Sequence, residues 1–116
     1  MTSGNKWSLI MDTLPPLPSN IGKKRRVIDI NGVIKQFTVL DEVSFSQSTN
    51  RKKAIYLQRI QFAEGGRIEL RLGYYIIGKK PKVLGKWVWG QFATLLPIEG
   101  FCKVYKLARQ KGWINC

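Results

Sequence analysis

The sequence has no histidine, two cysteines and only seven acidic residues in 116. Without histidine, neither a Ser-His-Asp triad nor a His-containing metal site can form. Two cysteines, Cys102 and Cys116, are too few for a disulfide framework or a zinc site. No apolar run approaches the roughly 20 residues that a membrane span needs, and no signal-peptide pattern opens the chain. We therefore expect a soluble, reduced, cytoplasmic protein with no metal, no cofactor and no membrane partner.

The few carboxylates also leave little material for an active site. Asp41 together with Glu69-Leu70-Arg71 is similar to the acid pair and cation of restriction-type nucleases, although the usual lysine is an arginine. Glu69 is explained more simply by ion pairs with Arg67 and Arg71 of the same strand. We favour that explanation and expect a protein that is not an enzyme. A metal-dependent nuclease is kept as an alternative.

What the chain has in excess is positive charge, with 20 lysines and arginines and a net charge of +13. This excess is far beyond the needs of solubility and indicates a polyanionic partner. Residues 1–22 hold only Lys6 and Asp12 among charged residues, so the excess lies in residues 23–116. We expect an N-terminal arm over 1–22, whose LPPLP stretch excludes helix, and a single basic domain over 23–116.

The order of the predicted elements indicates the fold. Asn31-Gly32 between two apolar runs, 27–30 and 33–40, predicts a hairpin with a type I′ turn, and Asp41-Glu42 breaks the second run. Residues 54–62 predict a further strand. A helical apolar pattern begins at the Pro97 turn and ends at Gly112. We expect an α+β fold, in which a twisted antiparallel sheet of about five strands carries one C-terminal helix on one face.

The centre of this sheet is a predicted hairpin of residues 67–77 and 83–92, joined by a basic loop over 78–82. Alternation in the first strand places Ile68, Leu70, Leu72, Tyr74 and Ile76 on the core side. A symmetric loop would put Trp87 opposite Gly73 and Trp89 opposite Arg71. The other face would then be aromatic and cationic together, with solvent in front of it.

Such a face suits single-stranded nucleic acid, because bases stack on flat rings while phosphates bind cations. Partners of this kind include DNA and RNA, and a single strand fits better than a duplex. We predict that four aromatic residues stack bases, namely Tyr56, Tyr75, Trp87 and Trp89. We predict that phosphates are held by the cations Lys23, Lys24, Arg25, Arg26, Arg51, Lys52, Lys53, Arg67, Arg71, Lys79, Lys80, Lys82 and Lys86.

The motif IELRLGYYI, the basic KKPK loop, a short strand and a final helix together resemble the positive cofactor four family of single-stranded-DNA-binding transcriptional coactivators. The resemblance covers about residues 55–111. It implies that a sheet face binds single strands, that the helix mediates a homodimer, and that the matching positions are Arg71, Tyr75, Lys80, Lys82, Lys86 and Trp89. The chain departs from the family in its N-terminal Asn-Gly hairpin and its tryptophan-rich last strand.

Two other interpretations remain open. The basic face could dock on an acidic protein, which would make the chain an adaptor or an inhibitor. The tryptophans could instead lie in a core or in a dimer interface.

Overall fold

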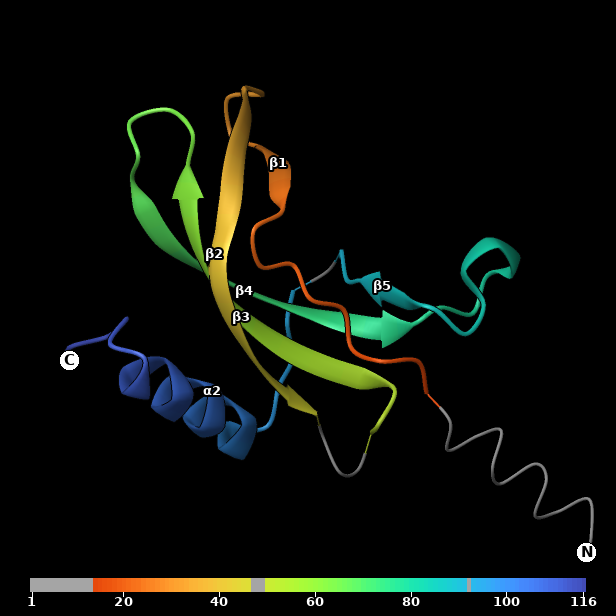
Figure 1. The fold of residues 1–116 in the computed structure, drawn as a ribbon. Helices are drawn as coiled ribbons and strands as arrows, with labels where there is room; N and C mark the ends of the chain where they lie inside the picture. The colour runs from red at the N-terminus through yellow and green to blue at the C-terminus, as the bar shows by residue number, and fades with distance from the viewer. Residues whose placement is uncertain (1–13, 47–49, 92) are drawn as a thin grey trace, which may run out of the picture.

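The computed structural model describes residues 14–46, 50–91 and 93–116. It contains one antiparallel sheet in which the strand order follows the chain, β1-β2-β3-β4-β5, and a C-terminal helix (Figure 1). This architecture confirms the expected α+β fold with five strands and one helix. The elements are β1 (Lys24–Ile28), β2 (Ile34–Ser46), β3 (Lys53–Phe62), β4 (Ile68–Ile77), the 3₁₀ turn η1 (Pro81–Val83), β5 (Trp87–Trp89) and α2 (Ile98–Gln110).

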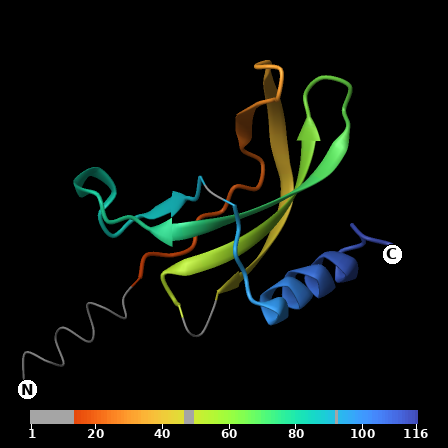
Figure 2. The same cartoon turned by 180° about the vertical axis from the view of Figure 1, so that it is seen from behind.

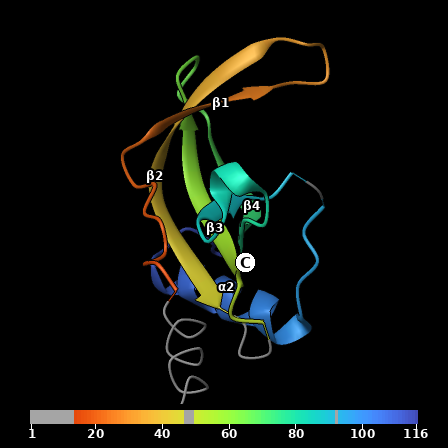
Figure 3. The same ribbon diagram turned by 90° about the vertical axis from the view of Figure 1, so that its right-hand side faces the viewer.

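The Asn31-Gly32 hairpin forms, but its turn is not type I′. Gly32 has a positive φ of 78°, whereas no other residue type has a positive φ in the described part of the chain. The carboxylate of Asp29 accepts hydrogen bonds from the backbone N–H groups of Asn31 and Val33, each at 2.9 Å. These bonds hold a longer loop with a single left-handed residue, and they lower the pKa of Asp29. Figure 3 shows this hairpin bending over one end of the sheet.

Strand β2 continues through Asp41-Glu42, where the sequence predicted a break. The register with β3 shifts between Val39 and Asp41, so the strand absorbs one extra residue there as a bulge. The polar pair is tolerated because Asp41 accepts a hydrogen bond from Lys111, the residue after α2, and Glu42 accepts one from the amide of Gln58 on the opposite face. Partners in the tertiary structure therefore override the local polarity.

The pairing of β4 with β5 differs from the symmetric hairpin that the sequence suggested. Trp89 pairs with Tyr75 and Trp87 with Ile77, so β5 is displaced by four residues from the predicted register. The cause is the connection over residues 78–86, which folds into the η1 turn and leaves only three residues for the strand. Side chains alternate between the two faces, so a shift by an even number of residues leaves both indoles on the predicted face.

Helix α2 ends as predicted at Gly112, which has a φ of 80°. The N–H of Trp113 donates to Ala108 O at 3.0 Å, and the N–H of Gly112 donates to Arg109 O at 2.9 Å. These two bonds are the Schellman arrangement. Trp113 then packs back on the core. The predicted apolar stripe is only partly buried, because Phe101 faces solvent.

The sheet has two faces with different covers. The helix face is covered by α2 and carries a core that includes Val43, Ile55, Leu57 and Tyr74. The opposite face, called the arm face below, carries Tyr56, Gln58, Arg71, Tyr75 and Trp89, as the strand register requires. Figure 2 shows the chain after β5 passing down beside the sheet to reach α2. Within the described residues, the structure offers no helix of the length and apolarity that a bilayer crossing requires.

Candidate nucleic-acid interface

The end of the N-terminal arm lies across the arm face. The hydroxyl of Tyr56 donates to Pro18 O at 2.7 Å, and the indole N–H of Trp87 donates to Pro15 O at 2.8 Å. The hydroxyl of Tyr75 donates to Asn20 Oδ1 at 3.1 Å. Proline is suited to this role, because its fixed φ keeps the segment extended and its carbonyl oxygens stay free to accept. The aromatic hydroxyl and indole groups therefore bind the arm.

Asn20 anchors the arm at one point. Its backbone N–H donates to Glu42 Oε2 at 2.7 Å and its side-chain amide donates to Glu42 Oε1 at 3.3 Å. Glu42 Oε1 also accepts from Gln58 Nε2 at 3.0 Å, and Arg25 donates to Asn20 Oδ1 at 3.1 Å. Asn20 is buried, as is Gln58. Every partner in this network is satisfied, so the arm and the sheet form one polar core.

The expectation that Tyr56 and Tyr75 face solvent is wrong. The exposed fraction of Tyr56 is 2% and that of Tyr75 is 9%, and the two rings meet edge to face at 4.9 Å. Burial raises the pKa of the Tyr56 phenol, with the nearby Glu42 carboxylate adding to the effect. These tyrosines support Trp89, whose ring centre lies 5.1 Å from that of Tyr75. Neither offers a free face to a base while the arm is in place.

Arg71 and Trp89 form the exposed border of this cluster. The guanidinium carbon of Arg71 lies 4.4 Å from the centre of the Trp89 ring and 5.2 Å from that of Phe37. Arg71 is half-buried, and its one side-chain hydrogen bond within the described residues goes to Gln58 at 3.4 Å. Burial lowers the pKa of the guanidinium, and the positive charge of Arg25 lowers it further against the opposing effect of Tyr75. Within the described residues, the guanidinium group of Arg71 therefore has no carboxylate as an ion-pair partner.

Gly73 makes room for the indole. A Cβ atom on Gly73 would lie 2.1 Å from Cζ2 of Trp89, which is far inside van der Waals contact. The indole can therefore lie directly on the β4 backbone between Arg71 and Tyr75. A glycine inside a strand is expected where another group approaches the backbone closely.

The cations of the first edge strand are divided between the two faces. Arg25 pairs with Phe37 and shares the arm face, whereas Lys24 and Arg26 have the opposite parity. Lys23, Lys24, Arg25 and Arg26 are all exposed. Lys24, Arg25 and Arg26 line a shallow groove with Gln36, and Arg26 shares a second groove with Arg67 at the far end of the sheet. Arg67 itself is engaged there, since its Nε lies 2.6 Å from Glu69 and its guanidinium lies 4.8 Å from the Phe62 ring.

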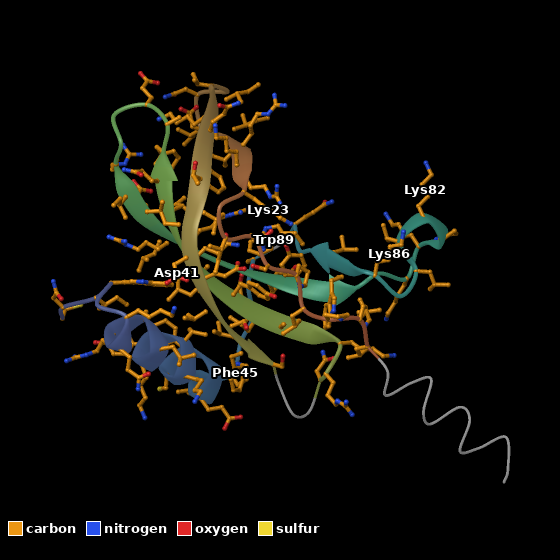
Figure 4. All side chains as sticks on the ribbon, viewed as in Figure 1. Lys23, Asp41, Phe45, Lys82, Lys86 and Trp89 are labelled. Carbon is orange, nitrogen blue, oxygen red and sulfur yellow. The ribbon has the colours of Figure 1, made fainter. Side chains whose placement is uncertain are left out.

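The connection between β4 and β5 presents a second group of cations. Lys79, Lys80, Lys82 and Lys86 are exposed on a loop that its own backbone bonds hold closed. Gly78 N donates to Lys86 O at 2.8 Å, and Lys86 N donates to Val83 O at 2.9 Å. Figure 4 shows Lys23, Trp89, Lys86 and Lys82 together on the side of the molecule away from α2. The two cation groups therefore flank the Arg71–Trp89 pair.

One predicted cation, Lys53, does not join this surface. Lys53 lies on the helix face, where its ammonium group donates to Leu95 O and sits 5.0 Å from the Tyr74 ring centre. Its strand position fixes this, because Lys53 shares the parity of Ile55. Lys52 is exposed in the loop before β3. Arg51 lies in the same loop.

Acidic residues in the described chain do not assemble the proposed nuclease site. Asp41 bonds Lys111 at 3.0 Å, on the helix face, whereas Glu69 pairs with Ile60 and lies on the arm face. The sheet therefore separates the two carboxylates. Over residues 14–46, 50–91 and 93–116, no three potential metal ligands come together.

Sequence reasoning missed three residues that shape the site, namely Asn20, Phe37 and Glu42. Phe37 was assigned to a strand, but its contact with Arg71 depends on β2 and β4 both neighbouring β3. A buried asparagine beside prolines gives no sequence signal for the partner that it will find. Comparisons with protein-family models, with curated proteins and with solved structures found no match to this chain.

Proposed function

We propose that this protein binds single-stranded or locally melted nucleic acid, and that it does so without catalysing a reaction on it. The binding surface consists of Arg71 and Trp89, the edge cations Lys23 and Arg25, and the lysines of the 78–86 connection. The alternative of an acidic protein partner is separated from this proposal by the experiment below.

The observation that carries the proposal is the state of Arg71. A half-buried guanidinium normally pairs with a carboxylate, because removing a charge from water is costly. Arg71 instead lies between the rings of Phe37 and Trp89, where burial lowers the pKa of its guanidinium group. A phosphate group would relieve this arrangement by supplying the missing negative charge.

The indole beside Arg71 supplies the second half of the recognition. Trp89 is only partly buried, and its ring lies next to the guanidinium group. A base with a free face can stack there while its phosphate meets Arg71. Bases in a duplex are already stacked on one another, which favours a single strand as the ligand.

The distribution of acids supports the same conclusion. Asp29, Asp41 and Glu69 are paired with Lys35, Lys111 and Arg67, and Glu42 is bound by amides. The described carboxylates are thus largely occupied away from the two cation groups that flank Trp89. The positive surface on this side is therefore available to a polyanion.

The test is a titration of tryptophan fluorescence with single-stranded and double-stranded oligonucleotides at two salt concentrations. Quenching by single strands, with affinity that falls steeply with salt, supports the proposal. Polyglutamate is the comparison ligand. If it binds as tightly and leaves the fluorescence unchanged, an acidic protein partner replaces nucleic acid.

Variants of Arg71 sharpen this titration. Arg71→Gln should weaken single-strand binding and reduce the slope of log affinity against log salt by about 0.7 to 1. Arg71→Lys keeps the charge but loses the planar stack, so it should restore the salt slope and not the full affinity. Lys106→Gln, on the exposed side of α2, is the control, because it removes one charge far from the site.

A further inference from the structure

Strand β4 has an open edge over its first half. It pairs with β3 from Ile68 to Ile76, but with β5 only from Tyr75 to Ile77. Within the described residues, no strand lies against the other side of residues 68–73. In Figure 1 this half of β4 runs along the outer side of the sheet. Open strand edges are sites where another strand can add.

The backbone hydrogen bonds show which groups this edge presents. Tyr74 O accepts from Gly90 N on the β5 side, whereas Arg67 O accepts from Phe62 N on the β3 side. Successive residues of a strand point their N–H and C=O groups to alternate sides. Ile68, Leu70 and Leu72 therefore direct both groups toward the open edge.

The side chains of the same three residues are also uncovered. They lie on the helix face, but α2 packs over β2 and β3 and leaves them exposed at 44%, 43% and 39%. Next to them on the arm face are Glu69 and Arg71, which are exposed and half-buried respectively. The edge is thus apolar on one face and carries opposite charges on the other.

We propose that this edge binds the same edge of a second copy of the chain, forming an antiparallel two-fold pair centred on Leu70. In this register Leu70 lies opposite Leu70 of the second copy, and Ile68 lies opposite Leu72. All three pairs are hydrogen-bonded pairs, because their N–H and C=O groups point at one another. The edge-directed backbone groups of Ile68, Leu70 and Leu72 are then all satisfied.

The charges favour this register over the two adjacent registers of the same parity. When Leu70 is on the two-fold axis, Glu69 of each copy lies opposite Arg71 of the other, which gives two attractive pairs. A shift that places Glu69 on the axis would oppose two glutamates and set Arg67 against Arg71. A shift that places Arg71 on the axis would oppose two arginines. Like charges directly opposite are destabilising.

The pairing would produce one continuous ten-stranded sheet, twice the five strands of a single chain. A two-fold axis normal to the sheet keeps both arm faces on the same side. The two Arg71–Trp89 pairs would then lie near the centre of one surface. The inference rests on the edge of β4 and on its charges. It shares Arg71 with the proposed nucleic-acid site, because Glu69 of the second copy would lie beside the guanidinium group that the proposed function assigns to a phosphate.

Single cysteine substitutions test both the contact and its register, in a chain whose exposed Cys102 and Cys116 are replaced by serine. Leu70→Cys should give a disulfide-linked dimer under mild oxidation, since hydrogen-bonded antiparallel partners have Cα atoms about 5.5 Å apart. Ile68→Cys alone should not, because the two copies of residue 68 would be about 14 Å apart. Mixing Ile68→Cys with Leu72→Cys chains should restore the link.

Mass measurement by sedimentation at micromolar concentration supplies the second readout. The unmodified chain should show twice the mass of one chain, and Glu69→Lys should halve it by setting lysine against Arg71. Glu64→Lys, the same charge change in the exposed turn before β4, should leave the dimer intact. A monomeric unmodified chain that also fails to cross-link through Leu70→Cys would overturn the proposal. Equal cross-linking through Ile68→Cys would overturn the register.

Discussion

The guanidinium group of Arg71 lies over the ring of Trp89, with its central carbon 4.4 Å from the ring centre. The two residues come from β4 and β5, which pair over only three positions. Their contact depends on Gly73, the residue that leaves space for the indole against the strand. The aromatic residue that packs this short strand against β4 therefore also belongs to the proposed binding surface.

Replacement of Trp89 by alanine should weaken the binding of a labelled single strand by about 1–3 kcal/mol, because a stacking surface is lost. The measurement is fluorescence anisotropy at fixed salt. Trp113→Ala is the comparison, since Trp113 packs on the helix-face core and should affect stability instead. Unchanged affinity in Trp89→Ala, with an intact fold, would show that the indole only packs.

Substitution of Gly73 by alanine should destabilise the protein by about 1–3 kcal/mol through overpacking against Trp89. The clash requires the indole, so the double variant Gly73→Ala with Trp89→Ala should lose less stability than the two single effects added together. Urea unfolding of the four proteins measures this coupling. Strict additivity would mean that Trp89 does not lie on Gly73 in solution.

Alkaline pH should expose the burial of Tyr56. The pKa of this phenol is raised above the ordinary value of 10.0, so the protonated form is favoured in the folded state. Its contribution to stability is complete below about pH 10 and is lost as pH rises through the higher folded pKa. Absorbance at the phenolate wavelength should show a late-ionising tyrosine that Tyr56→Phe removes. In denaturant, this tyrosine should ionise in the same pH range as the other tyrosines.

Loss of the Asn20 side chain should release the arm. Asn20→Ala removes hydrogen bonds to Glu42, Tyr75 and Arg25, and we expect a cost of about 1–3 kcal/mol for the buried groups left behind. Hydrogen exchange should become faster over residues 14–20. The exposed neighbour Ser19 provides the control variant Ser19→Ala. Equal protection in both variants would contradict the anchoring role of Asn20.

Two matched pairs of lysines should separate local from general charge effects. Lys80→Gln with Lys82→Gln should weaken single-strand binding more than Lys103→Gln with Lys106→Gln, although both double variants lose two charges. The first pair lies on the loop beside β5 and the second lies on α2. Affinities measured at several salt concentrations should show the smaller slope only for the loop variant. Equal losses would indicate attraction by net charge alone.

Local sequence signals determined much of the fold. The alternation in residues 67–77 predicted the two faces of β4, the Asn-Gly pair predicted a hairpin, and Gly112 predicted the end of α2. Each of these features depends on neighbours within a few residues, such as a side chain two positions away or a glycine that accepts a positive φ. Such signals can be read from a short stretch of sequence without knowledge of the tertiary structure.

The tertiary structure alone decided the register of β5, the passage of β2 through Asp41-Glu42 and the cover over Tyr56 and Tyr75. Each outcome depends on contacts between residues far apart in the chain, such as Pro18 with Tyr56 or Asp41 with Lys111. The free energy of these contacts depends on packing and on the satisfaction of buried polar groups, which no local pattern encodes. For this reason the sequence identified the face that carries Arg71 and Trp89, whereas only the folded chain determined how much of that face remains open.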